Sequence, residues 1–247
     1  MASDLFKTWL EPSATANGVR LYSERNGSRL TGMSELKRLL GDHFVGEATI
    51  LQAGGYQKAA DIIRNSLPGN KRTQSGDLGE LIATEYVDAE TNFRVPIRKL
   101  RWKSDRQMPM HGNDVIAIDS TSKPVRILKG ECKSRAICSA TVADEAAKSL
   151  DAHDGRPNPS TLAFITKRLY EEKRDAEARL FQDLQCSGAM TAKNITHMTF
   201  VLSGKDPSAL LASAAKPSTT GVKKEAAAVV VADHAAFVSA VFTTHGS

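Results

Sequence analysis

Three residues with ionisable side chains stand at the ends of two apolar segments in GNDVIAIDSTSKPVRILKGECKSR, residues 112–135. Asp114 precedes the first segment, and Glu131 and Lys133 end the second. Residues i and i+2 of a strand face the same side, so Glu131 and Lys133 project together and Cys132 points the opposite way. If the turn STSKPV joins the segments as a hairpin, we expect Asp114 to lie beside Glu131 at one edge of a sheet.

Two converging carboxylates and a lysine are the groups expected at a metal site that hydrolyses phosphate esters. Carboxylates with a carbonyl and waters suit Mg²⁺, with Mn²⁺ as a substitute. Such a metal lowers the pKa of a bound water and neutralises charge on a phosphate. Lys133 would orient or help deprotonate the water and stabilise the transition state. The pattern therefore favours phosphodiester hydrolysis.

An ordinary structural interpretation of the same residues stands beside this one. An acid followed two positions later by a lysine is a weak pattern, because many sheet edges carry solvated or salt-bridged groups. We also interpret Glu85 as a solvated helix-face residue and His111 as a loop residue without a role. The wider sequence has to decide between the two interpretations.

Composition describes a soluble globular protein. Of 247 residues, 41% are hydrophobic and 25% are charged, which are ordinary values. No apolar run approaches the roughly 18–20 residues that span a bilayer, and a secretory leader pattern is absent from the first residues. We expect a cytoplasmic protein without a membrane segment. The three cysteines show no CxxC spacing and are predicted to be reduced thiols.

Basic residues are concentrated between Arg94 and Arg106, although the net charge of +5 is small. Lysine and arginine neutralise phosphates, and Trp102 in the same run could stack on exposed bases. The alternative is a solvated strand face with a packing tryptophan. We also expect Lys129 to face the site. The candidates for DNA contact are Arg98, Lys99, Arg101, Lys103 and Lys129.

Helical and strand patterns alternate along the chain. Helices are predicted at 54–70, 75–91, 139–150 and 170–184. Strands are predicted at 93–102, 113–120, 125–134, 161–168 and 195–204, and residues 226–242 read as a strand followed by a short helix. This alternation predicts an α/β fold, a mixed central sheet flanked by helices. We expect an N-terminal elaboration over residues 1–50 and one α/β domain over 51–247.

Asp114 followed by Glu131-Cys132-Lys133 on the next strand resembles the PD-(D/E)xK nuclease pattern. The resemblance implies a restriction-endonuclease-like core and a further acid on an upstream helix, a role that falls to Glu80 in GDLGELIATEYV. It implies Glu80, Asp114 and Glu131 as metal ligands and, with Lys133, as catalytic residues. Asn113 stands where that pattern has a proline.

A longer string, from GDLGELIATEYV through VPIRKLRWKSDRQMPMHGNDVIAID to ILKGECKSR, is similar to a narrower family. It resembles the nuclease subunits of bacterial antiphage systems of the Hachiman (HamA) and AbpA kind over about residues 73–135. Later residues are compatible in element order. The resemblance implies a DNA target, a defence role and a superfamily-2 helicase subunit (HamB-like) as partner.

The leading hypothesis is therefore a Mg²⁺-dependent DNA nuclease subunit that works with a helicase. The alternative is a non-catalytic adaptor that binds DNA or the helicase through a nuclease-like fold, because fold does not imply function. A third interpretation, a restriction-type endonuclease acting alone, lacks a recognisable specificity domain.

Overall fold

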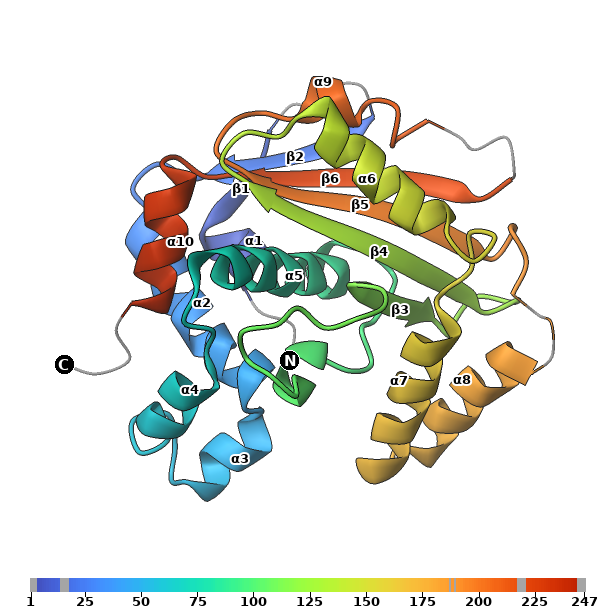
Figure 1. Cartoon of the computed structure of the whole chain (residues 1–247), viewed down its shortest axis with the longest axis horizontal. Helices are drawn as coiled ribbons and strands as arrows, with labels where there is room; N and C mark the ends of the chain where they lie inside the picture. Colours follow the sequence, from blue (N-terminus) through green and yellow to red (C-terminus); the bar gives the residue numbers. More distant parts are fainter. Residues whose placement is uncertain (1–3, 14–17, 187, 189, 217–220, 244–247) are drawn as a thin grey trace.

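A six-stranded mixed sheet forms the centre of the molecule, with strand order β1-β2-β6-β5-β4-β3 and helices packed around it (Figure 1). This computed structural model describes residues 4–13, 18–186, 188, 190–216 and 221–243. The expected α/β class, a mixed sheet flanked by helices, is confirmed.

Four central strands run parallel, and the two edge strands are antiparallel to their neighbours. The strands are β1 (Leu10–Pro12), β2 (Val19–Glu24), β3 (Val115–Asp119), β4 (Arg126–Arg135), β5 (Ile195–Ser203) and β6 (Lys223–Val230). The predicted hairpin is present, since β3 pairs antiparallel with β4 and Val115 lies opposite Gly130. β4 therefore extends beyond the end of its β3 partner.

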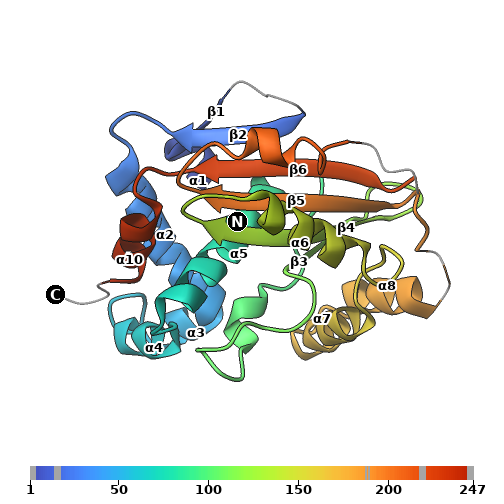
Figure 2. The ribbon, with the colours of Figure 1, turned by 45° about the horizontal axis from the view of Figure 1, so that its top comes forward.

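The helices cover both faces of this sheet. They are α1 (Leu5–Thr8), α2 (Arg29–Phe44), α3 (Glu47–Gln52), α4 (Ala60–Ser66), α5 (Lys71–Glu90), the 3-10 turn η1 (Lys99–Trp102), α6 (Ala140–Asp151), α7 (Pro159–Glu171), α8 (Asp175–Cys186), α9 (Ser208–Leu211) and α10 (His234–Phe242). Figure 2 shows α7 and α8 side by side, separated from the α2–α4 group by the segment that precedes β3.

Helix α5 is the longest helix described, and it packs on one face of the sheet. Its predicted apolar stripe is buried: Leu78, Leu81, Ile82 and Tyr86 all belong to the main core together with Phe200 of β5. On the opposite face, residues of α6 pack with the alternate residues of β5 and β6. Strands β4 and β5 are thus held between α5 and α6.

The predicted strand at residues 161–168 is wrong, because this segment lies within helix α7. Asn158 caps the helix by accepting a hydrogen bond from the Ser160 N–H at 2.9 Å, and Pro159 occupies the first turn, where its missing N–H costs nothing. Leu162 and Ile165 are buried one helical turn apart. A short apolar run does not distinguish helix from strand by periodicity alone.

The predicted strand at residues 93–102 is also wrong. Only a single bridge joins Arg94 to Ile118, and the chain then enters η1. Pro96 has no N–H for a strand ladder, and the Val95 N–H bonds to the Asp88 carboxylate at 2.8 Å instead. The segment leaves the sheet and passes beside α5.

The N-terminal region contributes to the same sheet. Strand β2 pairs in parallel with β6, and β1 forms the outer edge. The predicted division of the chain at residue 50 stays a prediction. The polar, turn-rich sequence at residues 213–224 predicts a surface loop, and residues 217–220 of this segment lie outside the described part of the chain. Among the described residues, no helix has the length and apolar character needed to cross a bilayer.

Candidate active site

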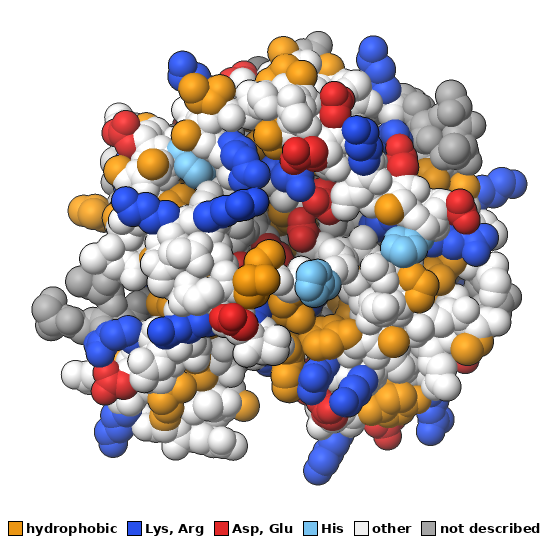
Figure 3. Space-filling view, in the orientation of Figure 1, with side chains coloured by type: hydrophobic (Ala, Val, Ile, Leu, Met, Phe, Trp, Pro, Cys, Tyr) orange, Lys and Arg blue, Asp and Glu red, His pale blue; other side chains and the backbone are white. Residues whose placement is uncertain are grey.

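One cleft brings together the four residues predicted to be catalytic. Glu80 comes from α5, Asp114 from the end of the segment before β3, and Glu131 and Lys133 from β4; all four line a cavity of about 530 Å³. Figure 3 shows acidic side chains in a hollow near the centre of one face, with Lys and Arg side chains beside it. Residues far apart in the sequence therefore meet at one accessible place.

The short β3 strand creates this site. Beyond Gly130, the edge of β4 has no β3 partner, because β3 begins at Val115. Asp114 fills the gap with its side chain: the Cys132 N–H donates to Asp114 Oδ2 at 2.8 Å. The carboxylate is thereby held at the strand edge next to Glu131, as the hairpin argument predicts.

Glu131 and Lys133 face the same side of β4 and form an ion pair of 2.8 Å between Lys133 Nζ and Glu131 Oε1. Ser149 of α6 donates to the other oxygen, Glu131 Oε2, at 2.6 Å. Burial lowers the pKa of Lys133, but the hydrogen bond and charge of Glu131 more than offset this and leave the pKa above its usual value. Lys133 is therefore a protonated cation.

Glu80 reaches the cleft because α5 lies very close to β4. A Cβ atom on Gly79 would lie 3.1 Å from the Ser134 Cβ, so glycine permits the close approach at this turn. Lys99 Nζ lies 3.7 Å from Glu80 Oε1, and the same ammonium donates to the Asn113 carbonyl. Lys99 thus ties the helix acid to the residue that precedes Asp114.

Three carboxyl groups of the cleft, those of Glu80, Asp114 and Asp77, have raised pKa values. Burial raises the pKa of Glu80 to about 7, against the opposing effect of Lys99. Burial also raises the pKa of Asp114 to about 7, and the charges of Glu131 and Glu80 add to the effect. The pKa of Asp77, one turn before Glu80, is raised by burial to about 6 although it pairs with a lysine. The cleft therefore favours an additional positive charge.

Oxygen donors of this kind fit a hard divalent cation such as Mg²⁺. As their side chains stand, however, the described residues include no group of three His, Cys, Asp or Glu arranged to hold an ion. Both oxygens of Glu131 are engaged, by Lys133 and by Ser149. The carboxylate oxygens are ligands that the metal prefers, and a bound cation would relieve the repulsion between the neighbouring acids.

Lys129 does not lie where DNA could reach it. Its side chain is fully buried, and its ammonium donates to the carbonyls of Leu150 and Ala152 at the end of α6, both at 2.8 Å. The expectation that Lys129 contacts DNA is therefore corrected. Burial lowers its pKa to about 8. Its position on the same face as Glu131 is as predicted, but the end of α6 covers that face at Lys129.

The other predicted DNA-contacting cations are engaged within the protein. Lys103 pairs with Asp77 at 2.8 Å, and its side chain is only 4% exposed. Arg101 Nη1 lies 3.7 Å from Glu172 Oε1. With the buried Lys99, these residues hold the segment before β3 in place. The basic run thus serves internal pairing, which the sequence alone could not reveal.

A buried charge network accounts for Arg98. Its guanidinium bonds to Glu85 at 3.0 Å and to Asp88 at 3.2 Å, and His43 Nε2 lies 2.8 Å from Glu85. The interpretation of Glu85 as a solvated residue is wrong, since its side chain is completely buried. The basic partners of Glu85 lie outside α5, so the spacing of residues within the helix could not reveal them.

Two cations that the sequence argument missed lie at the cleft. Arg72, in the first turn of α5, and Arg135, at the end of β4, line the same cavity as the carboxylates, and both are exposed. Arg135 follows Lys133 at the i+2 position of the strand, a spacing that could have identified it. These residues are better placed than the buried lysines to meet a phosphate backbone.

Comparison with known proteins shows the family to which this chain belongs. The HamA family model matches residues 3–244. The chain belongs to the HamA family. A curated HamA relative, the Hachiman protein HamA of Bacillus cereus, is 29% identical over 138 residues, which cover 56% of this chain and 49% of the relative. The match thus spans about half the length of that HamA protein, and the resemblance to HamA is confirmed at the level of the family.

Proposed function

We propose that this HamA-family chain is a Mg²⁺-dependent DNA nuclease that acts within a Hachiman-type antiphage defence system. One observation carries the proposal: Glu80, Asp114, Glu131 and Lys133 meet in a single cleft at the free edge of β4. Three acids and a protonated lysine at one accessible site suit phosphodiester hydrolysis.

The carboxylates of Glu80, Asp114 and Glu131 would hold the metal. When bound, Mg²⁺ would neutralise charge on the phosphate and lower the pKa of a water molecule. Lys133 would stabilise the negative charge that develops on the phosphate and orient the attacking water. Its raised pKa favours this electrostatic role over removal of a proton.

Arg72 and Arg135 would position the DNA strand over the carboxylates. Both are exposed at the cleft, and neutralising phosphates is the dominant source of affinity for DNA. Their contacts would be independent of sequence. This arrangement supports a nuclease that selects its substrate by structure or through a partner.

The family assignment supports a place in a Hachiman-type system, and the sequence resemblance implies a superfamily-2 helicase subunit as partner. We propose that the helicase recognises the DNA state and either restrains or delivers the nuclease.

The test is cleavage of supercoiled plasmid by the purified chain in Mg²⁺, with and without the neighbouring helicase subunit. Wild type, Glu131→Gln and wild type with EDTA are compared. We expect cutting only by wild type in Mg²⁺. Equal cutting by Glu131→Gln would exclude this cleft as the source of the activity.

A non-catalytic adaptor remains the second candidate. It is favoured by the engagement of both Glu131 oxygens within the protein and by the lack of a preformed three-residue metal group among the described side chains. An adaptor would bind DNA or the helicase equally well with Glu131→Gln and with EDTA, and it would not cut DNA under any of these conditions.

A further inference from the structure

A second cavity of about 480 Å³ lies beside the catalytic cleft, between the segment that follows η1 and the start of α7. We call it the Phe164 pocket; its principal lining residues are Trp102, Met110, His111, Asn158, Ser160 and Phe164. The segment from Met108 to Met110 lines both the pocket and the cleft. Only this segment therefore separates a ligand in the cleft from the pocket.

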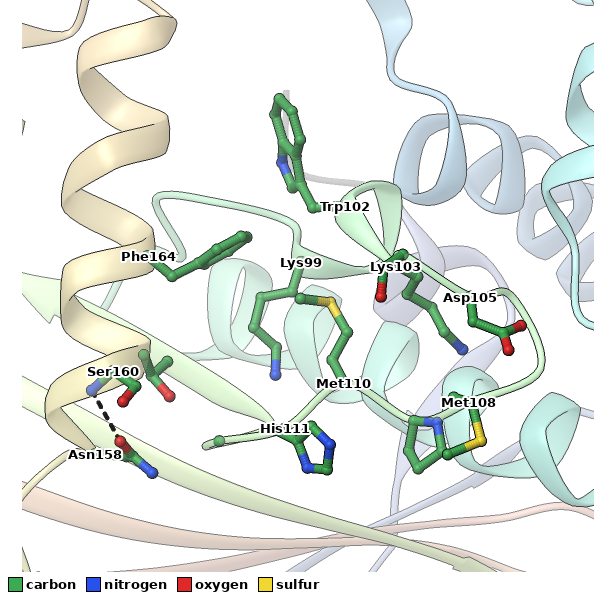
Figure 4. A pocket seen from close by; sticks show the side chains of 14 residues that line it. Lys99, Trp102, Lys103, Asp105, Met108, Met110, His111, Asn158, Ser160 and Phe164 are labelled. Atoms are coloured by element: carbon green, nitrogen blue, oxygen red, sulfur yellow. Dashed lines mark hydrogen bonds between the residues drawn. The ribbon is translucent and has the colours of Figure 1, made fainter.

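One wall of the pocket is aromatic. Phe164 points from α7 toward Met110 and Lys99 of the opposite segment (Figure 4). The Arg168 guanidinium lies 4.1 Å from the centre of the Trp102 ring and 5.2 Å from that of Phe164. A flat group thus already stacks on these rings, and the pocket leaves room for another.

The charged groups that line the pocket are poorly placed to bind a phosphate there. Lys99 is engaged with the Asn113 carbonyl and Glu80, and Lys103 is paired with Asp77. Asp105 adds a negative charge to the lining. The Phe164 pocket therefore favours an uncharged ligand over an anion.

Backbone donors at the start of α7 are also engaged. The Ser160 N–H donates to Asn158 Oδ1 at 2.9 Å, and the Thr161 N–H donates to the Asn158 carbonyl at 2.9 Å. An anion would find few unbonded donors here, whereas the Asn158 and Ser160 side chains can exchange hydrogen bonds with the polar edge of a flat ring. Aromatic faces with neutral polar groups at the edge are how proteins hold an unstacked base.

We propose that the Phe164 pocket takes one unpaired base of the DNA strand whose phosphate lies in the cleft. Bases of an intact duplex are stacked inside the helix and cannot enter such a recess without being flipped out. The protein would thus prefer single-stranded or locally opened DNA over continuous duplex. The location of the strand rests on the proposed nuclease function, but the base-binding property can be measured without cleavage.

The test is binding of a single-stranded oligonucleotide in EDTA, so that no cutting occurs. A fluorescent base, 2-aminopurine, reports stacking through quenching, and an oligonucleotide of the same length with abasic sites serves as the comparison. We expect quenching with wild type and about tenfold weaker binding by Phe164→Ala, the size of one lost stacking contact. The two proteins should bind the abasic strand equally.

Tyr170→Ala is the matched control, because Tyr170 lies on the same helix, is 40% exposed and is outside the pocket lining. It should bind both strands as wild type does. Phe164→Leu fills the space without an aromatic face, so it should also lose the base-dependent affinity. This variant takes the place of Phe164→Ala if Phe164→Ala proves too unstable to assay.

Equal binding of normal and abasic strands by wild type would overturn the proposal. So would unchanged quenching and affinity in both Phe164 variants. If base-dependent binding is found but the protein does not cut DNA in Mg²⁺, the pocket is supported and the nuclease function fails. If DNA is cut without any base dependence, the nuclease function stands and the pocket proposal fails.

Discussion

Lys133 is held as a cation by its neighbour. Its ammonium bonds to Glu131, which keeps the pKa above the usual value. If the lysine acts through its charge, Lys133→Ala should lower kcat by about 10²–10³, the range found when one charge-stabilising donor is removed. Plasmid nicking in Mg²⁺ measures this.

Lys133→Arg separates charge from proton transfer. Arginine stays protonated at any assay pH, so it should retain more activity than alanine, with an unchanged pH profile. An arginine variant as inactive as alanine would instead favour proton transfer by Lys133.

Lys129 and Arg135 make a contrasting pair of cations on β4. Lys129→Ala removes the donor for two carbonyl groups and should reduce the free energy of unfolding by about 1–3 kcal/mol. Arg135→Ala alters an exposed side chain at the cleft and should weaken DNA binding with little loss of stability. Urea unfolding and DNA affinity, measured on both variants, check this. Weaker DNA binding by a stably folded Lys129→Ala would contradict the buried role.

Among the elements, the β3–β4 edge depends on Asp114 for both structure and charge. Asp114→Asn keeps an oxygen that can accept the Cys132 N–H but loses the negative charge. We expect it to fold normally and not cut DNA. Asp114→Ala loses the acceptor as well and should unfold more easily. Melting curves and cleavage assays separate the two effects, and full activity in Asp114→Asn would exclude this carboxylate from catalysis.

Sequence could predict the elements that carry the site, because each has a clear period or turn. The stripe of Leu78, Leu81 and Ile82 marks α5, and the two apolar runs around STSKPV mark the hairpin. The sequence-based prediction was wrong for two segments whose apolar patterns resemble strands. The segment that contains Pro96 leaves the sheet, and residues 161–168 form part of a helix that Asn158 caps. Ion-pair partners such as Asp77 for Lys103 depend on tertiary contacts that no local spacing encodes.

For the whole molecule, the raised pKa values of Glu80 and Asp114, both about 7, predict how stability changes with pH. The folded state holds protons that the unfolded chain releases near pH 4. This contribution is complete below about pH 4 and is lost as pH rises through 7. In EDTA, Tm should therefore fall from pH 5 to pH 8.

Glu80→Gln should flatten that pH dependence and raise Tm at pH 8, by about 2–4 °C for each kcal/mol recovered. Mg²⁺ should raise the Tm of wild type at pH 8 more than at pH 6, because ligands must lose their protons to bind a metal. Thermal melts of both proteins at the two pH values test this. A Tm that is unchanged by Mg²⁺ would argue against a metal site.

The position of β6 has a consequence for synthesis on the ribosome. This strand lies between β2 and β5, yet residues 25–222 separate β2 from β6 along the chain. During translation, both neighbours must wait with an unpaired edge until residues 223–230 emerge and insert between them. Such distant pairing slows folding and leaves strand edges open to other chains. The newly made protein would thus complete its sheet only after residues 223–230 have left the ribosome.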